Sequence, residues 1–244
     1  MGKLLLSAVV LVGVCATSWA SATYVNPLGE WNADSSKSII LGKGILDRLY
    51  GLENLERIDD AGDQTWINTS GKAMAIAKVA GYEQNLGYQV YGSNTFNLLA
   101  TFNNVTEGGS DVWYSIPNPP AMFHFADNAK VGNSDKGTFS SNQAYNTKNQ
   151  DHMVTWLISD KKGNHSDNTV GNYVIGFEDL NWGDEWSAVA GQPGYMNGSD
   201  RDYNDLVCEV SGVKVPEPGT LSLFLLGLSS MIGMGWIRRK KTNV

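Results

Sequence analysis

Short runs in which apolar and polar residues alternate, separated by glycines and polar turns, occupy most of the chain between residues 73 and 213. A period of two residues is typical of β-strands, and it predicts strands at 73–79, 86–91, 97–102, 121–125, 152–158, 173–177 and 205–213. A helical spacing of apolar residues occurs only around 45–52. The pattern therefore predicts an all-β protein, mainly an antiparallel β-sandwich of the jelly-roll or immunoglobulin-like type, with one short N-terminal helix.

The first 22 residues have the pattern of a secretory signal peptide. Lys3 is followed by an apolar run over 4–14 and by small residues that end in Ala20-Ser21-Ala22. A basic start, a short apolar stretch and an Ala-x-Ala site predict export by the Sec machinery and cleavage after Ala22. The body of the protein is then expected outside the cytoplasm.

The other end of the chain combines an apolar run over 221–237 with a basic cluster at 238–241. This predicts a C-terminal transmembrane helix whose basic tail stays in the cytoplasm. Just before the helix lie Pro216, Glu217 and Pro218, and prolines on both sides of Glu217 favour an extended backbone that a protease cleft accepts. Without further processing, such a tail is a plain membrane anchor.

Residues 214–241 closely resemble the PEP-CTERM sorting signal, which joins a Pro-Glu-Pro triplet, one apolar helix and a basic end. The resemblance implies a Gram-negative bacterium that produces exopolysaccharide, and an exosortase as processing partner. The protein would be held in the inner membrane by its helix, cut at the triplet of residues 216–218, and then secreted or attached to the cell surface.

Charge is distributed unevenly along the chain. The formal net charge is −7, but all 25 acidic residues and only 13 of the 18 basic residues lie within 23–218, which gives this body a net charge of −12. Such a body repels phosphate backbones, so no nucleic-acid partner is expected. Half of the −12 falls in residues 178–205, where seven acids accompany one base, Arg201.

The acidic segment contains the candidate metal ligands, all of which offer oxygen atoms. Hard oxygen ligands favour Ca²⁺, and we expect residues 178 and 179 to meet the turn at 200–205 if strands 173–177 and 205–213 are neighbours. An EF-hand is excluded, because Ser211 stands where its last glutamate would be. The alternative is that these residues simply favour turns. The candidate ligands are Glu178, Asp179, Asp200, Asp202, Asn204 and Asp205.

Residues 150–213 resemble the DUF4114 family, through a Phe-Glu-Asp block at 177–179 and the run Asp-Arg-Asp-Tyr-Asn-Asp at 200–205. Residues 23–149 form the β-rich part of the body upstream, where 59–66 more loosely resembles PEP-CTERM proteins that carry this domain. The resemblance implies a secreted, often surface or adhesin-like bacterial protein with calcium at the acidic motif.

The sequence has few of the residue patterns that are typical of enzyme active sites. The three histidines lack zinc-type spacing, and Cys208 alternates with Leu206 and Val210 on an apolar face, as core cysteines do. We therefore predict a non-enzymatic, calcium-stabilised structural or adhesive module of the envelope or exopolysaccharide biofilm matrix. One alternative is a calcium-dependent carbohydrate-binding module that holds exopolysaccharide with Trp182 and Trp186; another is a polysaccharide-acting hydrolase.

Overall fold

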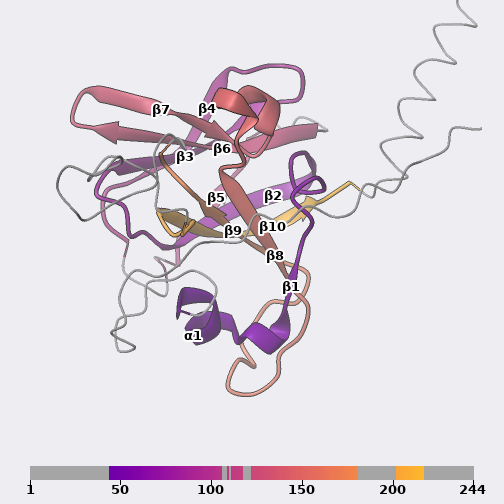
Figure 1. The fold of residues 1–244 in the computed structure, drawn as a ribbon. Coiled ribbons are helices and arrows are strands. Elements are labelled where there is room, and N and C mark those ends of the chain that lie inside the picture. The colour runs from indigo at the N-terminus through magenta and orange to yellow at the C-terminus, as the bar shows by residue number, and fades with distance from the viewer. Residues whose placement is uncertain (1–43, 106–108, 110, 118–121, 181–201, 217–244) are drawn as a thin grey trace, which may run out of the picture.

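The computed structural model describes residues 44–105, 109, 111–117, 122–180 and 202–216. The predicted signal peptide and transmembrane helix lie outside these residues. The described chain is mainly antiparallel β-sheet with one short α-helix, as predicted (Figure 1). Its elements are α1 (Leu46–Tyr50), β1 (Leu55–Arg57), β2 (Trp66–Ala77), β3 (Glu83–Val90), β4 (Phe96–Phe102), β5 (Tyr114–Ser115), β6 (Met122–Val131), β7 (Ser134–Ser140), β8 (Met153–Ile158), β9 (Tyr173–Phe177) and β10 (Leu206–Lys214), with short 3-10 turns at Leu52–Asn54, Gln143–Tyr145 and Thr147–Asn149.

The strands form one hydrogen-bonded path, in the order β1-β8-β9-β10-β2-β6-β3-β4, with β5 paired to β2 and β7 to β6. The long strand β2 joins the two halves, because it pairs with β10 along most of its length and with β6 only at Trp66 and Ile67. Side chains of both halves meet in one apolar core, so the sheet folds over on itself like a sandwich. Strands from both sides of residue 150, β1 to β7 before it and β8 to β10 after it, belong to this one sheet.

The core between the halves is built around Trp66, which is fully buried at the start of β2. Its indole ring makes edge-to-face contacts with Phe125 of β6 and Tyr173 of β9, with ring centroids 5.2 Å apart in each pair. Edge-to-face pairs of this kind stabilise a core beyond the burial of their area. One tryptophan thus fastens the two halves of the sandwich to each other.

A second apolar cluster lies on the other face of β8, β9 and β10, where α1 covers the sheet. Leu46 and Tyr50 of the helix are buried there against Val174 and Val207. The Tyr50 hydroxyl donates a 3.0 Å hydrogen bond to Glu209 of β10. The helix is shorter than predicted because Gly51 follows it at φ 73°, a left-handed conformation that ends an α-helix.

Three strands were not predicted, namely β1, β5 and β7, and β2 begins seven residues earlier than its predicted start at residue 73. Strands β1 and β5 have three and two residues, which is too short to show a period. Most of β7 is exposed or half-buried and polar, so it lacks the apolar alternation that marks a strand. These strands depend on pairing with β8, β2 and β6.

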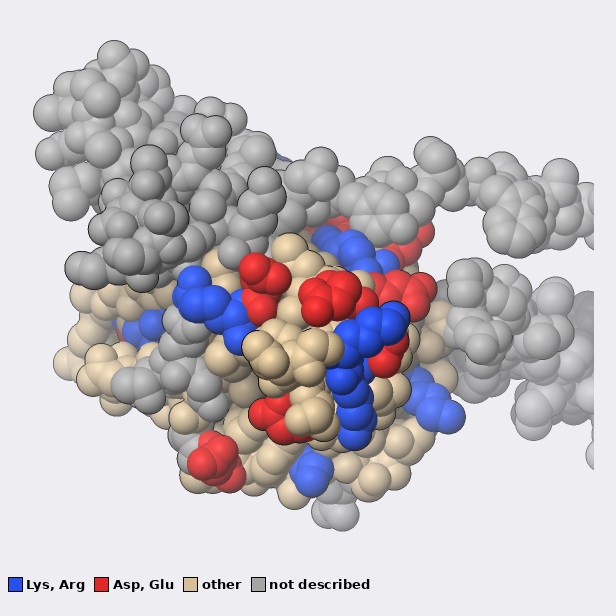
Figure 2. Space-filling view, turned by 90° about the horizontal axis from the view of Figure 1, so that it is seen from below, with Lys and Arg blue, Asp and Glu red and all other residues tan. Residues whose placement is uncertain are grey.

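Acidic and basic side chains are interspersed on the face shown in Figure 2, so the described Lys and Arg residues there stand among Asp and Glu residues rather than in a patch of their own. Nucleic-acid binding proteins gather basic side chains on one face or stripe. The mixture of charges on this face therefore agrees with the acidic body of the sequence, for which no nucleic-acid partner is expected.

Cys208 is fully buried on the core face of β10 with Leu206 and Val210, as the alternation predicted. Burial raises the pKa of its thiol well above the usual value, so the thiol stays protonated. In a full chain carrying Cys15→Ser, we expect no thiol to react with a disulfide reagent in the folded state and one to react in guanidinium. Reaction at full rate under native conditions would contradict this core position.

Candidate metal centre

The pairing of β9 with β10 positions the acidic residues. Phe177, the last residue of β9, pairs with Leu206, the first residue of β10, in antiparallel register. Glu178 and Asp179 therefore leave the sheet beside Asp205, and the Asp179 backbone N–H donates a 2.8 Å hydrogen bond to Asp205 Oδ2. The expectation that these two strands are neighbours is confirmed.

Three carboxylates converge at this point: Glu178, Asp179 and Asp205. Each offers one oxygen, and these oxygens all lie within 4.8 Å of one another. Glu178 and Asp179 are buried, and Asp205 is half-buried. Burial, followed by repulsion from Asp179, Glu178 and Asp202, raises the pKa of Asp205 well above its usual value. The ionised form of Asp205 is therefore disfavoured, and a positive partner would stabilise it.

Two polar side chains from the opposite half of the sandwich reach the same place. Gln84 of β3 donates a short hydrogen bond to Asp179 Oδ2, while the Gln84 Oε1 atom is buried without a hydrogen-bond partner among the described residues. Asp127 of β6 is fully buried, and neither carboxylate oxygen makes a hydrogen bond of normal geometry in the described part of the chain, although the backbone N–H groups of Asn85 and Asn128 act to lower its pKa. Burial, then repulsion from Asp179, raises the pKa of Asp127.

The sequence analysis missed Gln84 and Asp127. The predicted strands at 86–91 and 121–125 begin after Gln84 and end before Asp127, so neither residue was assigned to a face of a strand. In the sandwich β6 continues through Asp127, which shares the inner face with Phe125 because residues two apart in a strand point the same way; this spacing was the available signal. A charged side chain inside a core strand needs compensation, and that need points to a site.

Lys78 is a basic side chain close enough to three of these carboxylates for their charges to affect its pKa. It is half-buried just after β2, and its Nζ donates a 2.7 Å hydrogen bond to the Ala80 carbonyl. Burial lowers its pKa, whereas Asp179, Asp205 and Asp127 raise it. One ammonium group does not balance four carboxylates, so a further positive charge is required for all four to be ionised.

The turn before β10 owes its shape to Asp202 and Asn204. Asp202 Oδ1 accepts a 3.2 Å hydrogen bond from the Asn204 backbone N–H, the geometry by which Asp residues stabilise turns. The Asn204 side chain also bonds to Asp202, and the Asn204 carbonyl accepts a 3.2 Å hydrogen bond from Val79 N–H. Both are buried next to Asp205, and Asp202 is not one of the three converging carboxylates. The predicted ligand Asp200 and the aromatic candidates Trp182 and Trp186 lie outside the described residues.

Tyr203, between these two turn residues, is a core residue. Its side chain is fully buried and its backbone has φ 57°, which costs a non-glycine residue energy and persists only where the surroundings hold it. The holding contact is a 2.9 Å hydrogen bond from the Tyr203 hydroxyl to the Asp151 carbonyl. The turn that presents Asp205 is thereby fastened to the start of β8.

We expect Tyr203→Phe to lower the free energy of unfolding by about 1–2 kcal/mol, because it leaves the buried Asp151 carbonyl without this donor. Urea denaturation of the full chain measures the change. Tyr91→Phe is the matched control, since Tyr91 is exposed and its loss of a hydroxyl should have an effect below about 0.5 kcal/mol. Equal stability of the Tyr203 and Tyr91 variants would contradict the anchoring role.

Two parts of the chain match known protein families. Residues 122–213, which hold β6 to β10 and the three converging carboxylates, match the model of DUF4114, a domain of unknown function. The chain carries a DUF4114 domain. The match begins at β6, upstream of the segment at 150–213 whose motifs suggested the family. No curated protein and no solved structure matches the chain.

Residues 214–240, which follow the DUF4114 domain directly, match the PEP-CTERM protein-sorting motif. The motif indicates a protein that is exported, held in the membrane in transit, and processed by an exosortase to reach the cell surface or the extracellular space. Among the described residues no helix is long and apolar enough to cross a membrane. The predicted spanning helix at 221–237, with Glu217 and Pro218, lies outside them.

Proposed function

We propose that this exported protein is a non-enzymatic structural or adhesive module of the cell envelope or exopolysaccharide matrix, and that Ca²⁺ stabilises its DUF4114 domain. The observation that carries the calcium proposal is the convergence of Glu178, Asp179 and Asp205 within 4.8 Å. The PEP-CTERM motif supports the extracellular destination.

The donor set favours calcium among biological cations. All the converging atoms are carboxylate oxygens, which hard cations prefer, and no sulfur or imidazole nitrogen belongs to the group. Ligand oxygens on opposite sides of a Ca²⁺ ion lie about 4.8 Å apart, since each bond is about 2.4 Å long. The observed spread fits within this sphere. Gln84, whose amide nitrogen bonds to Asp179, offers its Oε1 as a further oxygen, and calcium accepts six to eight ligands in irregular geometry.

A bound ion would connect parts of the fold that are distant in sequence. Glu178 and Asp179 end β9 and Asp205 precedes β10, while Gln84 lies on β3 and Asp127 on β6. The ion would therefore act across both halves of the sandwich. Cys208 is a free, buried thiol, so a metal would serve the stabilising role that disulfides have in many exported domains.

The histidines support a non-enzymatic role. The Nδ1 atoms of His124, His152 and His165 lie 2.6, 3.0 and 3.2 Å from the backbone carbonyls of Gln64, Glu178 and Leu49. Burial lowers the pKa of His152 to about 4, so this side chain is neutral at physiological pH and its Nδ1–H donates to the Glu178 carbonyl. Such contacts fix backbone segments, whereas acid–base catalysis needs a histidine that faces a substrate.

Contact between this protein and a matrix polymer is a prediction from the sequence. Exopolysaccharide is the proposed partner because the resemblance of this chain to exosortase substrates implies a cell that produces exopolysaccharide. The carbohydrate-binding alternative depends on Trp182 and Trp186, and the hydrolase alternative on a pair of carboxylates such as Asp59 or Asp60 with Glu178.

Calcium should raise the melting temperature of the full chain in mild detergent, and EDTA should lower it. Binding only to the folded state contributes about 2.7 kcal/mol when free calcium is 100 times the dissociation constant. The Asp179→Asn, Asp205→Asn chain should show a smaller shift, because two of the three carboxylates become neutral. Asp167→Asn, at an exposed acid of another loop, is the control and should keep the full shift. Identical wild-type melting curves in calcium and EDTA would contradict the proposal.

Exosortase processing predicts the mass of the mature protein. In the native host, intact-mass spectrometry should find a chain that has lost the segment after the triplet at 216–218. A chain with Ala at all three positions should keep its C-terminus and stay in the membrane fraction, because the cleavage motif is gone. Thr220→Ala, two residues beyond the triplet, should be processed normally. Retention of the C-terminus by the wild-type protein would refute processing at this site.

A further inference from the structure

The sheet ends in strands that are hydrogen-bonded on one side only. Among the described residues these edge strands are β1 and β4, which end the path, and β5 and β7, which pair only with β2 and β6. An edge strand leaves a row of backbone N–H and C=O groups free to pair with a further strand, so proteins usually keep edge strands short or place charged side chains in them. An edge without these features is a place where another chain can be added.

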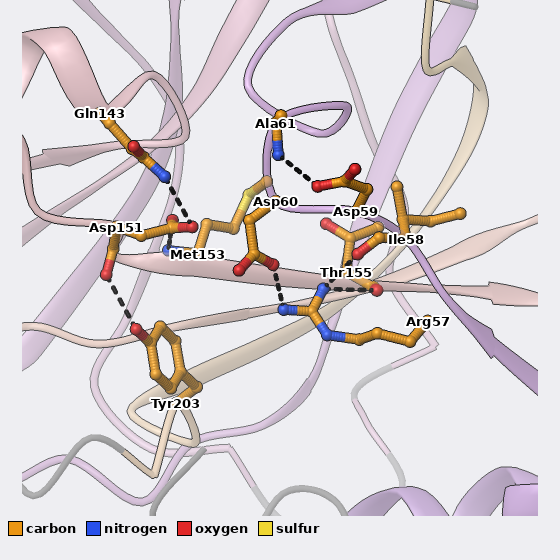
Figure 3. Close-up of polar contacts among 10 residues, drawn as sticks. All are labelled: Arg57, Ile58, Asp59, Asp60, Ala61, Gln143, Asp151, Met153, Thr155 and Tyr203. Carbon is orange, nitrogen blue, oxygen red and sulfur yellow. Dashed lines mark hydrogen bonds and ion pairs between the residues drawn. The ribbon is translucent and has the colours of Figure 1, made fainter. Parts of the chain in front are cut away.

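Three of the four edge strands have such protection. Strand β5 has two residues and β1 has three, and β1 includes the charged residues Glu56 and Arg57. The Arg57 guanidinium is held in place by the Thr155 carbonyl, to which it donates a 3.0 Å hydrogen bond (Figure 3). Strand β7 carries Asp135 and Lys136, and a register shift interrupts its pairing with β6. These three edges are therefore poor templates for a further strand.

Strand β4 lacks this protection. It has seven residues, none of them charged, and it pairs with β3 alone. Its other side makes no backbone hydrogen bond to any segment that the structure describes. A register shift beside Leu99 interrupts the pairing with β3, but Leu99 packs against the core and adds no charge to the edge. The outward backbone groups of β4 are thus available to another strand.

The hairpin of β3 and β4 also exposes apolar side chains. Leu98 of β4 is 55% exposed, the highest value for a large apolar residue in the described part of the chain, and Val90 and Tyr91 are exposed at the turn. The ring of Phe96 packs over Gly87 of β3, where a side chain would collide with it. A strand added beside β4 would cover part of this apolar surface, which would contribute to its binding in addition to the backbone hydrogen bonds.

The distribution of charge indicates which partner fits this edge. Strand β4 lies within residues 84–106, the longest stretch of the body without a charged residue. The body has a net charge of −12, so two copies repel each other and can approach best where acidic residues are absent. A basic partner would instead be attracted to the acidic segments of the chain. A second copy brings only uncharged side chains to β4, so no like charges face each other in any register of the two strands.

We propose that β4 pairs with β4 of a second copy of this chain, so that the sheet continues from one protomer into the next. Two identical strands related by a two-fold axis run antiparallel, as every strand pair in this sheet does. Contact between copies goes beyond the function proposed above, and it does not depend on calcium at Glu178, Asp179 and Asp205.

Hydrogen exchange of the full chain in mild detergent, followed by mass spectrometry over a series of protein concentrations, locates the contact. We expect the outward amides of β4, residues 96–102, to exchange at least about tenfold more slowly at concentrations where the dimer predominates, because pairing protects them. Strand β7 is the internal control, and its exchange should not change. Association without slower exchange in β4 would overturn the inference.

A lysine at the edge should weaken the association. We expect Leu98→Lys to raise the dissociation constant of the dimer, measured by sedimentation equilibrium, at least about tenfold, because edge lysines prevent further strand pairing. Val170→Lys is the matched control: Val170 is 49% exposed in the loop between β8 and β9, and the change adds the same charge. This control should dimerise like the wild type.

Leu98 is exposed, so both lysine variants should fold, and near-UV circular dichroism verifies this. A wild-type chain that stays monomeric at every concentration would overturn the inference. So would a Leu98→Lys chain that associates as tightly as the wild type, since the contact would then lie elsewhere, for example in the apolar segment at 221–237. Neither result bears on the calcium proposal, which depends on the melting temperature.

Discussion

The constraint on which the rest of this structure depends is the burial of carboxylates at the edges of its core. Glu178, Asp179 and Asp205 meet because β9 pairs with β10, and the same inner face that carries Phe125 brings Asp127 toward them. Removing charges from water is costly, and like charges that are close together add to the cost. The basic group of Lys78 offsets only a small part of this energetic cost. A fold with these residues in these places is stable only with further positive charge, as protons or as a cation.

Tyr203 connects two groups of buried acidic residues. Its ring is buried against the cluster under α1, and its hydroxyl bonds to Asp151. Burial, followed by the charges of Asp151, Glu178 and Asp60, raises its pKa. The turn at 202–205 thus has two roles: Asp205 is presented to Glu178 and Asp179, while Tyr203 fixes the turn on β8. An ion bound by Glu178, Asp179 and Asp205 would therefore stabilise the same turn that Tyr203 fastens to β8.

Periodicity in the sequence was sufficient to predict the core strands. The strand at 173–177 is observed as predicted, and the pairing of β9 with β10 follows from where the two acidic segments begin and end. The predicted ligands Glu178, Asp179 and Asp205 could therefore be brought together in advance. Gln84 and Asp127 could not, because the predicted strands at 86–91 and 121–125 leave both residues out, and only the observed pairing of β3 with β6 shows that both lie in the sheet and are buried.

The buried carboxylates Asp60, Asp63 and Asp151 show the same limit over a longer distance in the chain. Asp63 and Asp151 are 88 residues apart, and they meet because a three-residue strand, β1, pairs with β8 and carries the following turn onto Thr155. Such a strand has no detectable period. Asp59, Asp60 and Asp63 look alike in the sequence, yet Asp59 is half-buried and bonds within its own turn, whereas Asp63 is fully buried with unused oxygens.

Export and cation binding would reinforce each other in this protein. Calcium that binds only the folded chain adds stability in proportion to the logarithm of its concentration, and extracellular modules typically bind it with dissociation constants of about 0.1–1 mM. Without an ion, the carboxylates of Glu178, Asp179 and Asp205 repel one another and favour the unfolded chain. If calcium binds as proposed, the same carboxylates would become its ligands once the body is outside the inner membrane. The buried charge that weakens the free chain would then stabilise the protein in the compartment to which the sorting motif directs it.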